Sequence, residues 1–311
     1  MKLFQLTILL LFSLASTIGA FSVQDLKGVQ VKSLSDNDRM IDIGDWLSSK
    51  SSSSKDRSRK LVIFGTYAAD FNAIEYGQRL RYYWPQLQAK GIDQCAFLLS
   101  CQPTAARKLL QQVDLPTSKE DGIEVWTDNV GQAARVFGVQ RGWLPDNDNV
   151  NPFLKLFGML WGLGAWATLP AVIGGYIGNP FVAQPWIEDA LAVGQQQGRW
   201  PDMALELSTT SGKISPEVVT VNKFKDLPLV GSWPRRPLEL ATLRLQSMMG
   251  ISLANWDDLA PDQEALDAGV LTQLGGCMVV ETDGTTTKPI YEWRDPGICA
   301  VANFELMLKQ I

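Results

Sequence analysis

The sequence predicts an α/β fold in which helices flank a central mixed β-sheet. Two apolar runs, at residues 61–65 and 94–100, lack polar alternation, which is typical of strands buried on both faces. Between them, apolar residues recur at steps of three and four from Phe71 to Leu87, and the segment ends at Gly91, which indicates an amphipathic helix. Strand and helix patterns then alternate again, so we expect parallel strands with right-handed crossovers.

The other elements follow from local patterns along the chain. Alternating residues at 29–32 and 40–43 predict an N-terminal hairpin, and a serine-rich stretch at 48–58 predicts a loop. The polar residues from 188 to 233 favour a surface excursion or an extended docking segment. The same reasoning predicts helices at 103–113, 130–137, 237–249 and 301–311, and strands at 123–126, 276–281 and 290–293, the last two forming a final hairpin.

Composition excludes several classes of function. With 311 residues, of which 46% are hydrophobic, the chain can bury the core of one large domain or two small ones. A net charge of −5 argues against a nucleic-acid partner. The chain has no histidine, which excludes Ser-His-Asp triads and imidazole metal sites. Its 4 cysteines lack paired spacing, so we expect no metal site and no cofactor.

The N-terminus resembles a targeting leader. Residues 1–20 carry Lys2, a short apolar stretch and a small-residue ending at Ala20, which predicts a secretory signal peptide, with an uncleaved anchor as the alternative. The Ala20-Phe21 junction resembles the bipartite plastid leaders of algae, so we assign residues 21–60 to targeting, the N-terminal hairpin and the serine-rich loop. The expected location is the plastid (chloroplast), where the protein could associate with thylakoids, and the alternative is the secretory pathway.

Two motifs near the C-terminus carry a resemblance to a known family. Leu274-Gly275-Gly276 leads into the final hairpin, which ends at Arg294-Asp295-Pro296-Gly297. Together with the order of elements, these motifs resemble the peroxiredoxin-like branch of the alkyl hydroperoxide reductase and thiol-specific antioxidant family, especially its cyanobacterial and plastid members. The resemblance covers residues 27–145 and 235–311 and implies a thioredoxin-like fold. Residues 146–234 are then a mostly helical insertion and a polar excursion before the C-terminal hairpin and helix.

The resemblance also implies where a catalytic thiol would lie, at the start of the long helix after the first central strand. Alignment of this helix with the family motif places Asp70 and Ala73 at the two cysteine positions. Neither side chain can form a sulfenic acid or a disulfide. A carboxylate just before a helix caps its backbone N–H groups, so we expect Asp70 to be an N-cap rather than a catalytic group.

Two other cysteines are candidate reactive thiols. Cys101 follows a predicted strand at the sheet edge where open α/β sheets place their sites, and Cys299 could approach this edge from the final loop. Cys95 and Cys277 lie within apolar strands and are expected to be core residues.

The segment from residue 156 to residue 187 contains 32 residues without a charge. Three interpretations remain open: a buried helical hairpin, an element in the membrane interface, and a transmembrane helix. Its aromatic residues Trp161, Trp166, Tyr176 and Trp186 are candidate contacts with a partner or a membrane.

Two functions are compatible with these features. The first is a peroxiredoxin-like protein without its catalytic cysteines, which serves as a binding, assembly or structural factor in a plastid. It would have a protein partner and possible peripheral membrane contact. The second is a thiol-dependent peroxidase or antioxidant that uses Cys101 or Cys299.

Overall fold

A seven-stranded sheet organises the chain, and the computed structural model describes residues 21–35, 39–49, 57–117, 121–177, 185–199, 207–210, 213–219, 237–283 and 286–311. The strand order is β2-β1-β5-β4-β3-β8-β9. β3, β4 and β5 pair in parallel, whereas every other pairing is antiparallel, which confirms the predicted α/β class and mixed sheet. The strands are β1 (Gln30–Ser33), β2 (Met40–Asp42), β3 (Ser58–Phe64), β4 (Ile92–Leu99), β5 (Ile123–Thr127), β8 (Gly276–Thr282) and β9 (Thr287–Arg294).

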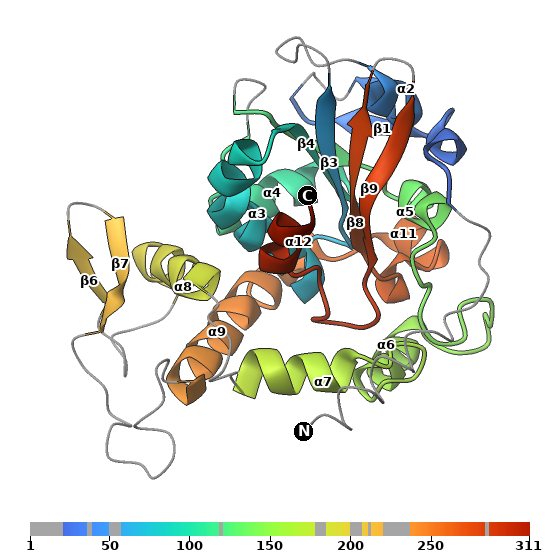
Figure 1. Cartoon of the computed structure of the whole chain (residues 1–311). Coiled ribbons are helices and arrows are strands. Elements are labelled where there is room, and N and C mark those ends of the chain that lie inside the picture. Colours follow the sequence, from blue (N-terminus) through green and yellow to red (C-terminus); the bar gives the residue numbers. More distant parts are fainter. Residues whose placement is uncertain are drawn as a thin grey trace, which may run out of the picture.

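Helices cover both faces of this sheet, because alternate residues of its central strands point to opposite sides (Figure 1). Leu61 and Ile63 of β3 face one core, and Val62 and Phe64 face the other. The first core is covered by α3 (Phe71–Ala89), α4 (Pro103–Val113) and α12 (Phe304–Gln310), with α8 (Pro185–Gln196) and α9 (Pro237–Ser252). The second is covered by η2 (Val23–Leu26), α2 (Ile43–Ser48) and α5 (Gln132–Phe137).

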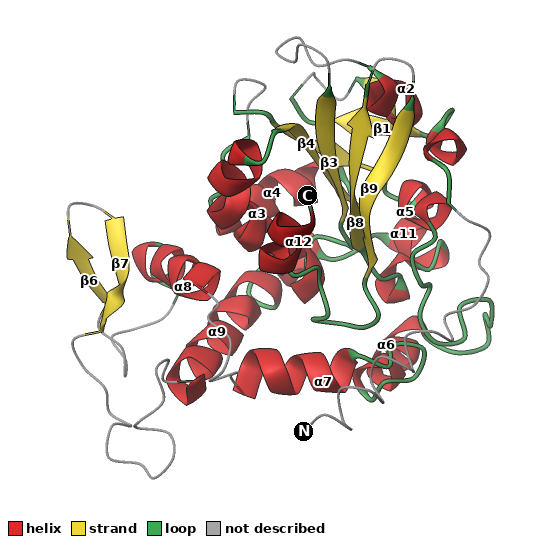
Figure 2. Ribbon diagram, viewed as in Figure 1, coloured by secondary structure: helices red, strands yellow, loops and turns green. Residues whose placement is uncertain are grey.

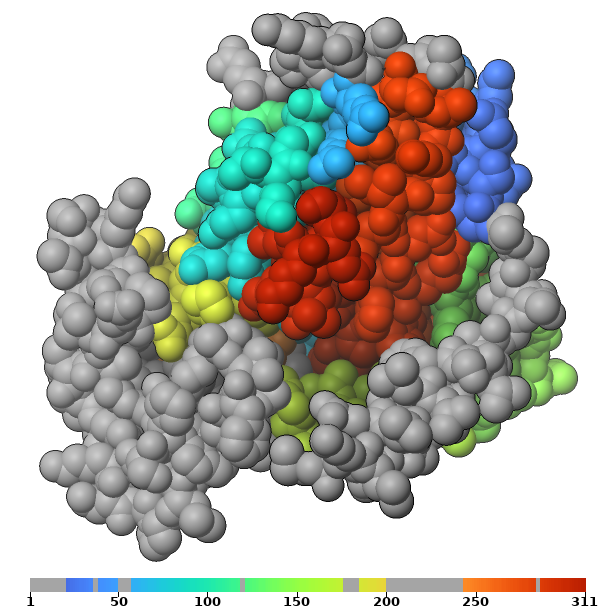
Figure 3. Space-filling view, viewed as in Figure 1, coloured from blue at the N-terminus to red at the C-terminus, as the bar shows by residue number. Residues whose placement is uncertain are grey.

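The long helix α3 follows β3 and lies beside the C-terminal helix. Asp70 caps its N-terminus, and Gly91, at φ +81°, lets the chain turn into β4. Figure 3 shows α12, in red, between the teal α3 and the orange β8–β9 hairpin on the molecular surface. α3 therefore connects the first half of the sheet to the last segment of the chain.

Shorter elements occupy the region between α5 and β8 (Figure 2). The described elements are α6 (Pro152–Leu160), α7 (Thr168–Val172), the π-helical turn η3 (Ile173–Ile177), β6 (Leu207–Thr210), β7 (Lys213–Val219), α10 (Trp256–Leu259), α11 (Gln263–Asp267) and η4 (Val270–Thr272). β6 and β7 form a separate antiparallel hairpin.

The predicted polar excursion is wrong at its start, over residues 188–196, whereas residues 200–206, 211–212 and 220–233 of it lie outside the described part of the chain. The polar excursion predicted from residue 188 begins instead as α8, a helix whose residues Trp186, Ile187 and Leu191 are buried against the core. The polar residues of α8 suggested a surface segment, but one of them, Asp189, forms an ion pair with Arg81 of α3.

The described part of the uncharged segment, residues 156–177 and 185–187, is not buried throughout. Large apolar side chains such as Phe157, Leu169 and Ile173 are exposed, whereas Met159 is buried. Among the described residues, none of the helices has the length and apolar character that crossing a bilayer requires. The interpretation as an element in the membrane interface stays a prediction, and the exposed apolar side chains of the described part are compatible with it.

Candidate functional site

The N-terminus of α3 is the position where the family resemblance places a catalytic thiol, and oxygen and methyl groups occupy it here. Asp70 is the N-cap residue, and its carboxylate accepts a hydrogen bond of 3.3 Å from the backbone N–H of Asn72. Burial raises the pKa of Asp70 to about 6, against backbone donors that favour its charged form. Ala73 is fully buried. Asp70 thus has the capping role predicted for it.

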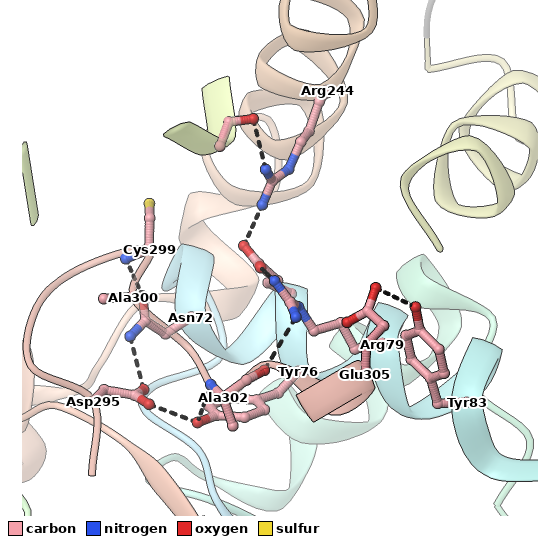
Figure 4. Close-up of polar contacts among 12 residues, drawn as sticks. Asn72, Tyr76, Arg79, Tyr83, Arg244, Asp295, Cys299, Ala300, Ala302 and Glu305 are labelled. Carbon is pink, nitrogen blue, oxygen red and sulfur yellow. Dashed lines mark hydrogen bonds and ion pairs between the residues drawn. The ribbon is translucent and has the colours of Figure 1, made fainter. Parts of the chain in front are cut away.

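A buried carboxyl from the final loop closes this end of the helix (Figure 4). Asp295 accepts hydrogen bonds from Asn72 Nδ2 at 3.0 Å, from the Tyr76 hydroxyl at 2.6 Å and from Trp293 Nε1 at 3.1 Å. Burial raises the pKa of Asp295 to about 8, although these three donors favour the charged form. The Tyr76 oxygen also accepts the backbone N–H of Ala302, at 3.2 Å. These bonds fasten the last loop to the first two turns of α3.

Cys299 lies beside the same helix terminus. Its backbone N–H donates a hydrogen bond of 2.6 Å to Asn72 Oδ1, and its φ of 62° lies in the left-handed region. Its thiol points away from Asn72 and Asp295 in Figure 4. Cys299 is partly exposed, whereas Cys95, Cys101 and Cys277 are buried. The described contact of Cys299 with α3 is thus made by its backbone, and its predicted approach to the sheet edge of Cys101 stays a prediction.

Cys101 is a poor candidate for a reactive thiol. It is 1% exposed, and burial raises its pKa to about 12, so it is protonated at neutral pH. It lines a cavity of about 180 Å³ at the carboxyl ends of β4 and β5, together with Thr127 and Asn129. Cys95 and Cys277 are fully buried, as expected, with pKa values raised well above 9.0 by burial.

A second buried cluster lies one turn further along α3. Glu75 is bound by Arg79 of the same helix, at 2.6 Å, and by Arg244 of α9. Both guanidinium groups lie over the Trp186 ring, with the Arg79 carbon 4.5 Å and the Arg244 carbon 4.8 Å from the ring centroid. Arg79 also donates to the carbonyl of Ala302 at 3.1 Å, so this cluster shares the final loop with Asp295.

The predicted aromatic contacts divide into exposed and buried residues. Trp161 and Trp166 are 66% and 59% exposed, which fits a contact surface. Trp186 is only 1% exposed, so its assignment as a contact residue is wrong: its ring packs against the guanidinium groups of Arg79 and Arg244. The side chain of Tyr176 lies outside the described residues. We define the α6–α7 surface by its exposed residues Phe153, Leu154, Phe157, Leu160, Trp161, Leu163, Trp166, Leu169 and Ile173.

Several residues of these clusters were missed by sequence reasoning. Asn72, Tyr76 and Arg244 gave no local signal, because each partner lies far away in the chain. Asp295 was part of the quoted Arg-Asp-Pro-Gly motif, and this motif was the one available signal. In the part of the chain that the structure describes, no group of three or more Cys, Asp or Glu residues could hold a metal ion.

Comparisons with protein-family models, with curated proteins and with solved structures find no match to this chain. What the site can do must therefore be inferred from its geometry.

Proposed function

We propose that this protein has a thioredoxin-like, peroxiredoxin-like scaffold that lacks the catalytic thiol site and serves as a non-catalytic binding or assembly factor. The parallel β3-α3-β4 unit, the antiparallel β8–β9 hairpin beside β3 and the closing helix α12 support the scaffold assignment. In this proposal, the segment from α6 to α9 is an insertion in that scaffold.

The observation that carries the proposal is the filled N-terminus of α3. A peroxidatic site needs a thiolate at the helix N-terminus with space for a peroxide. Here Asp70 caps the helix, Ala73 is buried, and Asp295 is bound to Asn72 and Tyr76. These contacts support a structural role for this end of α3.

The α6–α7 surface supports a binding role. Monomeric proteins rarely expose large contiguous apolar patches without a functional reason. Its two exposed tryptophans suit a membrane interface, where amphipathic rings lie at headgroup depth. The proposed contacts of this surface are a partner protein at a thylakoid membrane and the bilayer interface around it.

The plastid location belongs to the same proposal and rests on the leader alone. A fusion of residues 1–60 to a fluorescent reporter should accumulate in plastids. Fluorescence confined to the secretory pathway would contradict this location.

Hydroperoxide consumption tests the non-catalytic assignment. With a dithiol reductant, the full chain should consume peroxide no faster than a Cys101→Ser/Cys299→Ser variant.

A pull-down from solubilised thylakoids, compared between the wild type and a Phe157→Ser/Trp161→Ser variant, tests the binding role. A partner captured equally by both proteins would contradict the assignment of the α6–α7 surface.

A thiol peroxidase that uses Cys299 is the second candidate, favoured by the partly exposed position of this residue beside α3. Its thiolate would attack one peroxide oxygen, the O–O bond would break, and the alcohol would leave. The sulfenic acid formed would then be reduced by a dithiol with release of water. Peroxide turnover that disappears in Cys299→Ser alone would select this candidate.

A further inference from the structure

A groove of about 600 Å³ opens between the N-terminus of α6 and the α11–η4 segment. Its size is within the range of small-molecule sites. Asn151, Phe153 and Lys155 line one side, and Asp267 and Leu271 line the other. None of these residues belongs to the clusters around α3.

Lys155 is the unusual member of this lining. It is 7% exposed, and its side chain makes no hydrogen bond or ion pair with any residue that the structure describes. The stem of Lys155 is buried, whereas its ammonium is not among the buried unbonded atoms and is open to the groove that the residue lines. A ligand with a negative charge in the groove would supply the counter-charge for this ammonium.

The start of α6 adds to the positive potential at the same place. α6 begins at Pro152, and Asn151 caps it by accepting the N–H of Phe153 at 2.9 Å. The first turn of a helix attracts anions, and acidic side chains commonly occupy it. The first turn of α6 has no acidic residue, so a bound anion would meet both Lys155 and the helix terminus.

Two carboxylates at the rim restrict the ligand further. Asp148 and Asp267 also line the groove, and both are exposed. In water they repel an anion only weakly, and they accept hydrogen bonds from hydroxyl groups. The groove therefore suits an oxyanion with neighbouring hydroxyls.

We propose that the groove binds the anionic, hydroxyl-bearing headgroup of a membrane lipid, with the oxyanion on Lys155. Phe153 joins the groove to the exposed apolar residues of α6, since it lines the first and is 49% exposed among the second. A lipid bound there would have its acyl chains beside the α6–α7 surface. The inference rests on the proposed membrane contact of that surface.

Vesicle flotation of the full chain tests the inference, with phosphatidylcholine vesicles that either contain or lack phosphatidylglycerol. The wild type should bind the phosphatidylglycerol vesicles roughly five- to tenfold more tightly. Lys155→Met should lose this preference and still bind phosphatidylcholine vesicles as the wild type does. Lys155→Arg should keep the preference, and so should Lys309→Met, which removes an exposed lysine as the matched control. Lys155→Met keeps an unbranched apolar side chain in place of the buried stem, so its melting temperature should stay within about 1–2 °C of that of the wild type.

Separate outcomes overturn the inference and the proposed function. The headgroup site alone is wrong if Lys155→Met still prefers the phosphatidylglycerol vesicles. It is also wrong if the wild type binds both kinds of vesicle equally. If the wild type binds neither kind of vesicle, both the headgroup site and the proposed membrane contact are wrong. Glycerol 3-phosphate is the soluble probe, and calorimetry measures its binding to the wild type. If it binds and phosphatidylglycerol vesicles do not compete with it, the groove is a site for a free phosphate. The lipid assignment is then wrong.

Discussion

The backbone N–H of Cys299 donates a 2.6 Å hydrogen bond to the side-chain oxygen of Asn72, in the first turn of α3. A cysteine thus lies beside the helix terminus where the family resemblance places a thiol, but it comes from the opposite end of the chain. Its thiol points away from the terminus (Figure 4). The first turn of α3 therefore binds the backbone of this cysteine, while the carboxylate of Asp70 caps the N-terminus of the helix.

Native alkylation should distinguish the four thiols. Cys299 is partly exposed, whereas Cys95, Cys101 and Cys277 are buried. We expect iodoacetamide to modify Cys299 in the folded protein and to modify the other three only after denaturation, as read by mass spectrometry of peptides. Rapid native modification of Cys101 would contradict its burial.

Substitution of Glu75 should destabilise the fold strongly. Glu75→Gln leaves Arg79 and Arg244 buried without their shared counter-charge, which costs about 3–5 kcal/mol of unfolding free energy. Urea denaturation measures this loss. Glu292→Gln is the control, because its pair with Arg294 is partly exposed and should contribute less than about 1 kcal/mol. A similar loss of unfolding free energy in both variants would show that the buried cluster contributes no more to stability than the partly exposed pair.

The buried carboxyl of Asp295 should make stability depend on pH. Its pKa is about 8 in the folded protein against 3.8 for the free group, so the folded state binds more protons between these values. The free energy of unfolding should therefore fall as pH rises from about 4 to 8. Asp295→Asn removes this titration, and its melting temperature should change less between pH 5 and pH 8 than that of the wild type. An unchanged pH slope in Asp295→Asn would assign the dependence to other groups, such as Asp70, whose pKa is about 6.

Polar substitutions on the α6–α7 surface should separate binding from folding. Phe157 and Trp161 are 56% and 66% exposed, so Phe157→Ser/Trp161→Ser should leave the melting temperature unchanged within about 1–2 °C. Sedimentation with thylakoid membranes should fall at least about tenfold. Trp186→Ala provides the contrast, because loss of this buried ring should cost about 3–5 kcal/mol of stability. Full membrane binding by the double variant would remove the α6–α7 surface from the proposed function.

The sequence predicted the elements whose patterns are local. The helix at 103–113 is confirmed with the predicted bounds, because Pro103 marks its first turn and a regular apolar face follows. β3 and β4 are likewise confirmed, since continuous apolar runs suit strands covered on both faces.

The parts that sequence reasoning missed depend on contacts between distant residues. Asp295 and Tyr76 are 219 positions apart, and Glu75 and Arg244 are 169 apart. The sequence pattern also suggested exposure for Trp186, because an aromatic residue in an uncharged stretch gives no sign that two arginines from other helices will pack against it. Such pairings become visible only when α3, α8 and α9 are brought together.

The contacts of Trp186 with Arg79 and Arg244 have a consequence for attempts to shorten the chain to a minimal core. The indole from α8 and the guanidinium from α9 complete the environment of Glu75, which belongs to α3. A truncated version without the residues between α5 and β8 would therefore place an ionised glutamate and Arg79 at a newly opened, water-exposed face. A shortened protein of this kind would need replacement side chains on α3 to keep that face stable.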